Sequence, residues 1–246
     1  MDDIQATKFY IRHRRENYPE TEVLFYAWLG MWSLNVETAP FHAYEDVDMF
    51  DDIGPTVGVA GWIGDVWHGL QRLGKPIPPP LDYPVELREF LQRDVWQTTL
   101  GEVRAAAKPI FVKPTTHKLF AGFVWTGDAA SRRTVITHRD DTPVWVSEPI
   151  DIVSEYRSFV LRDTVLDCRK YKGDWGRAPD RAVVTAAVDR FKKVAPAAYV
   201  IDWAVTADGR TALIEANDGL AFGHYGLPPV SYARMLAARW HELASN

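Results

Sequence analysis

The pattern of apolar and polar positions predicts a small unit of alternating strands and helices in the first third of the chain. It predicts strands over residues 6–12 and 56–61 and helices over 22–34 and 62–73. The first of these helices is apolar on all sides, which is typical of a buried helix. Residues 74–80 include four prolines, and proline cannot continue a helix or a central strand. We therefore expect a boundary near residue 80.

Strands dominate the middle of the chain, and the last third mixes strands with helices. The pattern predicts helices over 84–93, 180–194 and 231–243, strands over 109–113, 120–126, 133–138 and 144–147, paired strands over 155–166, and a hairpin over 199–217. Strands and helices mixed in this way predict an α+β fold.

The late hairpin carries the most informative chemical signal. Its two apolar strands flank Asp208-Gly209, a dipeptide favoured in two-residue hairpin turns. With these two residues as the loop, Asp202 lies directly opposite Glu215. Asn217 lies on the same face, because side chains alternate along a strand. The other face is apolar and comprises Ile201, Trp203, Val205, Ala212, Ile214 and Ala216.

Two carboxylates that face each other across a sheet repel, so we expect a cation to neutralise them. Oxygen donors suit Mg²⁺, which needs few protein carboxylates when it also binds substrate phosphates. Asp202, Glu215 and Asn217 are therefore the predicted metal ligands. The alternative is an exposed hairpin face on which water screens the two acids.

Three cations stand out because their neighbours are apolar. Lys113 ends a strand, where it is either a snorkelling side chain or a fixed positive charge for a phosphate. Arg157 and Arg169 lie on apolar strands, and buried arginine is rare unless it is paired. A guanidinium suits bidentate recognition of carboxylate or phosphate. Alternatively, the arginines form internal salt bridges, for example with Glu155 or Asp167.

Composition narrows the class of partner. The net charge of −5 argues against a general nucleic-acid or anionic-membrane protein. No apolar run approaches the roughly 20 residues needed to span a bilayer, and Met1-Asp2-Asp3 is acidic where a signal peptide would be basic. The single cysteine, Cys168, allows no internal disulfide and no cysteine zinc site. We expect a cytoplasmic protein that binds neither nucleic acid nor membrane.

The serial order of these features resembles the ATP-grasp superfamily. The matching segments are PIFVKP with Phe120-Ala121-Gly122, SEPIDIVSEYRSFV, LDCRKYKGDW and YVIDWAVTADGRTALIEANDG, spread over residues 81–227. Within the superfamily, the chain resembles a compact clade of predicted amide ligases marked by two arginines and a lysine. The resemblance implies an ATP-grasp domain over 81–246, whose lobes (about 81–147 and 148–246) clasp ATP, after a reduced N-terminal αβ domain over 1–80.

The resemblance also implies a role for each candidate residue. Lys113 would contact the nucleotide phosphates, Glu155 would bind the ribose hydroxyls, and adenine would be held by Glu148, Pro149 and Ile150. Many members cover the phosphates with a glycine-rich loop. Residues 115–119 contain no glycine, and Lys118 is one candidate to replace that loop.

For the acceptor, the resemblance assigns Arg157 and Arg169 to the substrate carboxylate and the acyl phosphate, and it matches Asp202, Glu215 and Asn217 with the Mg²⁺ ligands. It implies an ATP- and Mg²⁺-dependent carboxylate–amine ligase that forms an amide through an acyl phosphate. The substrates would be a carboxylate and an amine, each a small molecule or a peptide. Two alternatives remain: an ATP-binding module without ligase activity, and a phosphotransferase that stops once its acceptor is phosphorylated.

Overall fold

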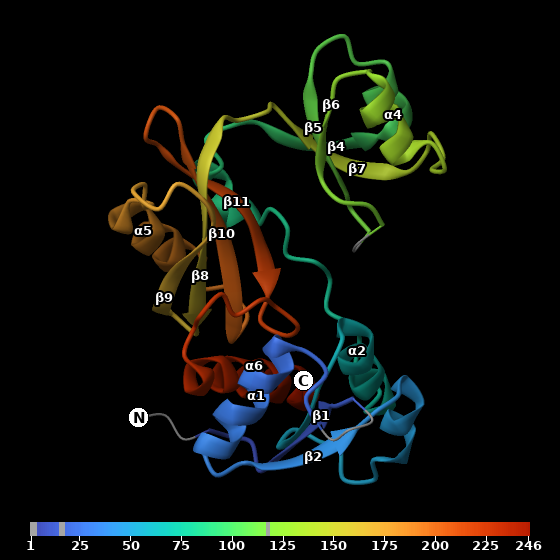
Figure 1. Cartoon of the computed structure of the whole chain (residues 1–246), viewed down its shortest axis with the longest axis vertical. Coiled ribbons are helices and arrows are strands. Elements are labelled where there is room, and N and C mark those ends of the chain that lie inside the picture. Colours follow the sequence, from blue (N-terminus) through green and yellow to red (C-terminus); the bar gives the residue numbers. More distant parts are fainter. Residues whose placement is uncertain (1–3, 15–17, 117–118) are drawn as a thin grey trace.

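The computed structural model describes residues 4–14, 18–116 and 119–246. Within these ranges the strands form three sheets, of three, four and four strands. Figure 1 shows the N-terminal sheet at the bottom, the central sheet at the left and the small sheet at the upper right. Helices cover each sheet, which confirms the predicted α+β class. No helix in the described ranges is long and apolar enough to cross a membrane.

The N-terminal sheet is parallel, with β1 (Lys8–Arg12) between β2 (Glu37–Phe41) and β3 (Val57–Ala60). It is accompanied by α1 (Glu22–Ser33), the 3-10 helix η1 (Tyr44–Met49) and α2 (Ile63–Arg72). The predicted strands and helices of this part are confirmed. The pattern missed β2, an edge strand that contains Pro40, because proline is depleted in strands and tolerated chiefly at sheet edges.

The burial of α1 differs from the prediction. Leu24, Ala27 and Met31 are buried, but Trp32 is 66% exposed and Phe25 is 41% exposed. The helix therefore buries one side against the rest of the protein, although its sequence is apolar all round.

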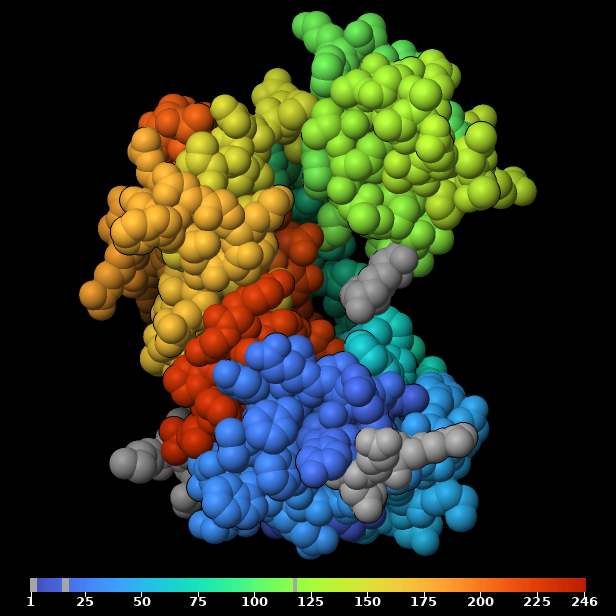
Figure 2. Space-filling model, viewed as in Figure 1, coloured from blue at the N-terminus to red at the C-terminus, as the bar shows by residue number. Residues whose placement is uncertain are grey.

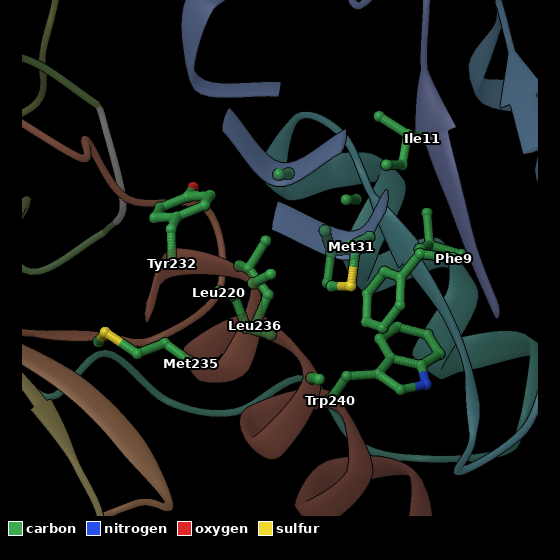
Figure 3. Close-up of a cluster of buried hydrophobic side chains, with 14 of the residues drawn as sticks. Phe9, Ile11, Met31, Leu220, Tyr232, Met235, Leu236 and Trp240 are labelled. Carbon is green, nitrogen blue, oxygen red and sulfur yellow. The ribbon is translucent and has the colours of Figure 1, made fainter. Parts of the chain in front are cut away.

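The C-terminal helix α6 (Pro229–Ser245) packs against α1 and the N-terminal sheet, so the two ends of the chain share one core. The close approach depends on Gly30 of α1, where a Cβ atom would lie 2.0 Å from the carbonyl oxygen of Pro229. Figure 3 shows side chains of this core from β1, α1, α6 and the segment before α6, among them Phe9, Met31, Leu220, Tyr232, Leu236 and Trp240.

The central sheet is antiparallel, with the strand order β11-β10-β8-β9. Its strands are β8 (Ile152–Leu161), β9 (Thr164–Gly173), β10 (Ala198–Thr206) and β11 (Thr211–Asp218). One face packs against α5 (Arg181–Phe191) and the 3-10 helix η2 (Val85–Phe90) around the buried Trp203. All nine residues of β10 are buried, so the opposite face is covered as well.

The β10–β11 hairpin differs from the prediction in two places. Its loop is three residues long, because the Thr206 amide bonds to the Arg210 carbonyl and Gly209 adopts a positive φ of 84°. A β-bulge then follows between Asp202 and Trp203, where Ile214 is left out of the pairing. These two features shift the register in opposite directions, so Asp202 pairs with Glu215 as predicted.

The bulge changes which β11 side chains face the core. Leu213 belongs to the buried cluster, whereas Ile214 is half-buried and lines a cleft on the other face. The prediction that Ile214 belongs to the apolar face is therefore wrong.

The small sheet has the strand order β4-β7-β5-β6 and is antiparallel throughout. It consists of β4 (Val95–Thr99), β5 (Ile110–Pro114), β6 (Phe123–Trp125) and β7 (Pro143–Ser147), with the short helices α3 (Leu100–Arg104) and α4 (Ala129–Val135). The predicted strand over 133–138 is wrong, because this segment includes the end of α4. Asp128 caps that helix by accepting the Ser131 amide at 2.8 Å.

Candidate functional site

A cleft of about 480 Å³ lies where the three sheets meet. Figure 2 shows the hollow between the green small-sheet region and the rest of the molecule. The walls come from the linker before η2, from β5 and the residues after it, from the central sheet, and from the β11–α6 loop (residues 219–228). The cleft brings together six of the predicted site residues: Lys113, Glu155, Arg157, Asp202, Glu215 and Asn217.

Four charged residues form a row across the central sheet. Glu215 on β11 pairs in register with Asp202 on β10, Asp202 with Arg157 on β8, and Arg157 with Arg169 on β9. Residues in register on neighbouring antiparallel strands point to the same face. Two acids therefore stand beside two bases on one face.

Arg157 and Asp202 form a buried bidentate pair. Arg157 Nε donates to Asp202 Oδ1 at 2.8 Å, and Nη2 donates to Oδ2 at 2.7 Å. The two side chains are only 11% and 4% exposed, so water does not screen them. Burial raises the pKa of Asp202, and Arg157 acts in the opposite direction. The alternative of a solvent-screened hairpin face is therefore wrong.

Lys113 joins the small sheet to the central sheet. Its ammonium reaches Asp82 of the linker and Glu215 of β11, each at 2.5 Å. Burial acts to lower the pKa of Lys113, but the two carboxylates outweigh it and hold the pKa above its usual value. Burial likewise acts to raise the pKa of Glu215, but Lys113 outweighs it and keeps that pKa below its usual range. Lys113 is thus a fixed, paired charge rather than a snorkelling side chain.

The predicted metal ligands lie together at one end of the row. The Asn217 amide lies 2.9 Å from Glu215 Oε1 and 3.3 Å from Asp202 Oδ2. Among the described residues, no three His, Cys, Asp or Glu side chains are grouped so as to hold a metal. Two carboxylates and one amide fit Mg²⁺ that takes its other ligands from phosphates and water. Each carboxylate oxygen keeps a further lone pair beside the cation it already binds.

Two tyrosines enclose the Arg157 side chain. Tyr225 and Tyr171 stack at 4.8 Å, and the Arg157 guanidinium lies 5.0 Å from the first ring and 6.0 Å from the second. The Tyr171 hydroxyl donates to Glu155 at 3.0 Å, and Lys172 pairs with the same carboxylate. Glu155 is thereby held at the wall of the cleft with a side chain that is 15% exposed.

The remaining predicted site residues lie outside the cleft lining. Arg169 pairs with Asp167 at 2.6 Å and is 43% exposed, so the internal salt bridge named as its alternative is present. Residues 148–150 connect β7 to β8, with Glu148 and Pro149 exposed, and do not line the cleft. Lys118 lies outside the described residues.

Sequence reasoning missed three residues of the site. Tyr171 could have been found, because it follows Arg169 by two positions on a predicted strand. Asp82 follows the proline-rich linker and has a φ of 46°; its carboxylate accepts from Lys113 and from the Trp145 indole. Tyr225 lies in the β11–α6 loop. No sequence pattern brings either of these two to the cleft.

Solved structures share the fold at low sequence identity. D-Cycloserine synthetase DcsG is 14% identical, with a TM-score of 0.60 over 95% of this chain and 99% of that chain. D-alanine–D-alanine ligase from Bacillus anthracis is 14% identical, with a TM-score of 0.55 over 97% and 96%. N5-carboxyaminoimidazole synthetase from Staphylococcus aureus is 9% identical, with a TM-score of 0.61 over 96% and 77%. At these identities the likeness establishes the fold alone.

Sequence comparison identifies the family. No curated protein sequence matches the chain. A family model matches residues 90–235, which is more than half of the chain, and describes an ATP-grasp domain in family 2 of the clade named for two arginines and a lysine. This range includes β5, the row of charges across the central sheet and the start of α6. The chain therefore belongs to the ATP-grasp superfamily, in family 2 of that clade.

Proposed function

We propose that the protein is an ATP- and Mg²⁺-dependent ligase that joins a carboxylate to an amine. The observation that carries the proposal is the arrangement of opposed acids and buried cations in one cleft of an ATP-grasp chain. In this reaction a carboxylate oxygen attacks the γ-phosphorus of ATP, and ADP leaves. The amine nitrogen then attacks the acyl carbon, the amine loses a proton, and inorganic phosphate leaves.

The metal site in this proposal consists of Asp202, Glu215 and Asn217. A magnesium ion bound there would neutralise the phosphates and help to orient them. Lys113 would exchange its present partners for phosphate oxygens, and Glu155 would bind ribose. The backbone around Glu148, Pro149 and Ile150 would hold adenine at the connector between the two sheets.

In the proposed reaction Arg157 binds the substrate carboxylate and then the oxyanion that develops on it. Asp202 occupies Nε and one hydrogen of Nη2. Within the described part of the chain, Nη1 donates to the Gly223 carbonyl, at the long distance of 3.5 Å. The edge formed by Nη1 and Nη2 thus retains donors for a second carboxylate. Arg169 extends the positive end of the row on β9.

The proposed function is tested by ADP release from ATP and Mg²⁺ in the presence of panels of carboxylates and amines. Mass spectrometry of the products should show condensation of one carboxylate with one amine and loss of water. ADP release that needs a carboxylate but gives only a phosphorylated acceptor would indicate a phosphotransferase. Nucleotide binding without turnover on any panel would favour a non-catalytic module.

Lys113→Ala should weaken nucleotide binding. Loss of one charged hydrogen bond costs about 2 kcal/mol, or about thirtyfold in affinity. Mg²⁺–ATP should raise the melting temperature of the wild type, because ligand binding stabilises the native state. The variant should lose most of this shift, measured from its own ligand-free value because Asp82 and Glu215 are left unpaired.

Lys192→Ala is the matched control for Lys113→Ala. Lys192 also pairs with a carboxylate, Asp189, but on the surface at the end of α5. This variant should keep the full nucleotide shift. If no purine nucleotide stabilises the wild type, the ATP-binding proposal is wrong.

A further inference from the structure

A second cavity, of about 200 Å³, lies behind the cleft against the N-terminal sheet. Its walls come from β1, β3, the first turns of α1 and α2, the β11–α6 loop and α6. Figure 3 shows side chains that line it, among them Phe9, Leu220, Tyr232, Leu236 and Trp240.

The cavity presents an apolar surface. Most of its lining is aliphatic or aromatic. The polar groups of three lining side chains already have partners. The Thr21 hydroxyl accepts from the Leu24 amide, the Tyr232 hydroxyl donates to the Phe222 carbonyl, and the Trp240 indole donates to the Gly54 carbonyl. A ligand in this cavity therefore gains stability by burying apolar surface rather than by new hydrogen bonds.

The cavity and the cleft share one wall. The shared residues are Ile63, Leu220, Ala221, Phe222 and Gly223. Gly223 is the residue whose carbonyl accepts from Nη1 of Arg157. The cavity therefore begins beside the guanidinium edge proposed to bind the substrate carboxylate.

Size limits what the cavity can hold. An apolar cavity of about 150 Å³ in another protein binds benzene. A volume of about 200 Å³ thus suits one aromatic ring or one branched aliphatic group. A long chain or a charged group does not fit it, because an unpaired charge would be buried.

We propose that this cavity holds a compact apolar group of the carboxylate substrate, so that the preferred acid carries a phenyl or branched aliphatic group close to its carboxylate. This assignment rests on the proposed ligase function. Arg157 holds the carboxylate at the shared wall, and the apolar group extends from there toward Phe9 and Leu236. The N-terminal part of the chain then selects the acid, while the central and small sheets bind the nucleotide.

The test compares three acids that differ only in their apolar group: acetate, 3-methylbutanoate and phenylacetate. Binding is measured by thermal shift and by calorimetry in the presence of Mg²⁺–ADP. Turnover is measured as ADP release, with hydroxylamine as the amine, so that an acyl phosphate is converted to a hydroxamate. We expect phenylacetate and 3-methylbutanoate to bind the wild type at least about tenfold more tightly than acetate. Benzylamine carries the ring without a carboxylate and should bind weakly.

Val23→Phe should fill the cavity from the first turn of α1, where Val23 is half-buried and lines it. It should remove the preference for phenylacetate over acetate. Val183→Phe is the matched control, because Val183 is a half-buried valine in the first turn of α5, outside both cavities. It should keep the wild-type preference. Leu236→Ala enlarges the cavity and should shift the preference toward acids larger than phenylacetate, which provides a second test if Val23→Phe is unstable.

The outcomes separate this inference from the proposed function. If the binding preference is present and is lost in Val23→Phe, but no acid supports ADP release, the cavity assignment holds and the ligase function fails. If acids support turnover but wild type, Val23→Phe and Leu236→Ala share one acid preference, the function holds and the cavity assignment is wrong. Equal binding of acetate and phenylacetate to the wild type also overturns the assignment.

Discussion

Asp202→Asn and Glu215→Gln should each lower Mg²⁺-dependent ATP turnover by about a hundredfold or more. Each variant removes one negatively charged oxygen donor from the proposed metal site, and charge stabilisation of this kind is worth several kcal/mol in transfer reactions. Turnover is measured as ADP release over a range of Mg²⁺ concentrations. Asp189→Asn, which changes an exposed carboxylate on α5, is the control and should keep wild-type turnover.

The same two variants should differ in stability. Asp202→Asn leaves the buried Arg157 without its charged partner, which we expect to cost about 3 kcal/mol of unfolding free energy. Glu215→Gln should cost less, because Lys113 keeps Asp82. Repulsion between the two acids alone would predict that each variant is stabilised, but each acid already has its own cation. Wild-type turnover in both variants would show that the metal site lies elsewhere.

Glu215→Gln also has a pH signature. The folded-state pKa of Glu215 is below its usual value, so its ionised form contributes stability above that usual value, about 4.3. This contribution is lost as the pH falls through the folded-state value. The stability of Glu215→Gln should therefore depend less on pH in the acidic range than that of the wild type, as measured by chemical denaturation at several pH values.

The pairing of Asp202 with Glu215 was predicted correctly, but for a reason that is only partly right. A two-residue loop with an unbroken ladder gives this register. The protein reaches it with a three-residue loop and a compensating bulge at Ile214. A bulge depends on how the strand fits the adjoining surfaces, so local sequence does not specify it. The faces of Leu213 and Ile214 were therefore assigned wrongly, although the charged pair was not.

The error at residues 133–138 has a local cause. Val135, Ile136 and Thr137 are β-branched and favour a strand by intrinsic propensity. The Asp128 cap nevertheless starts a helix whose Val135 is buried in the small-sheet core. Packing and the cap outweigh the strand preference, because intrinsic propensity is weak where tertiary contacts are available.

The candidate site was predictable as far as it lies on regular strands. Alternation along β8, β10 and β11 brings Arg157, Asp202 and Glu215 to one face, and these residues are in register. The contributions of Asp82 and Tyr225 could not be predicted, because each belongs to a segment without periodicity that only the tertiary fold brings to the cleft. The division into domains at residue 80 and the assigned ligand roles stay predictions.

Arg157→Lys should lower carboxylate-dependent ADP release by about a hundredfold. The loss of one charge-assisted contact to a developing oxyanion costs about 3 kcal/mol. An ammonium can still pair with Asp202, but it cannot bind Asp202 through one edge and a substrate carboxylate through the other. The folded state should survive, and the thermal shift with Mg²⁺–ATP should be close to that of the wild type. The proposed contacts to the nucleotide come from Lys113 and Glu155 instead.

Arg169→Lys is the matched comparison. Arg169 lies directly opposite Arg157 on β9, but its guanidinium pairs with Asp167 and does not line the cleft. We therefore expect this variant to lose less than about tenfold in turnover, since an ammonium can keep a partly exposed ion pair. Equal losses in the two variants would mean that both arginines hold the acceptor. Loss of nucleotide binding together with turnover in Arg157→Lys would show that Arg157 serves ATP or the fold, because a residue that holds only the carboxylate leaves the nucleotide shift unchanged.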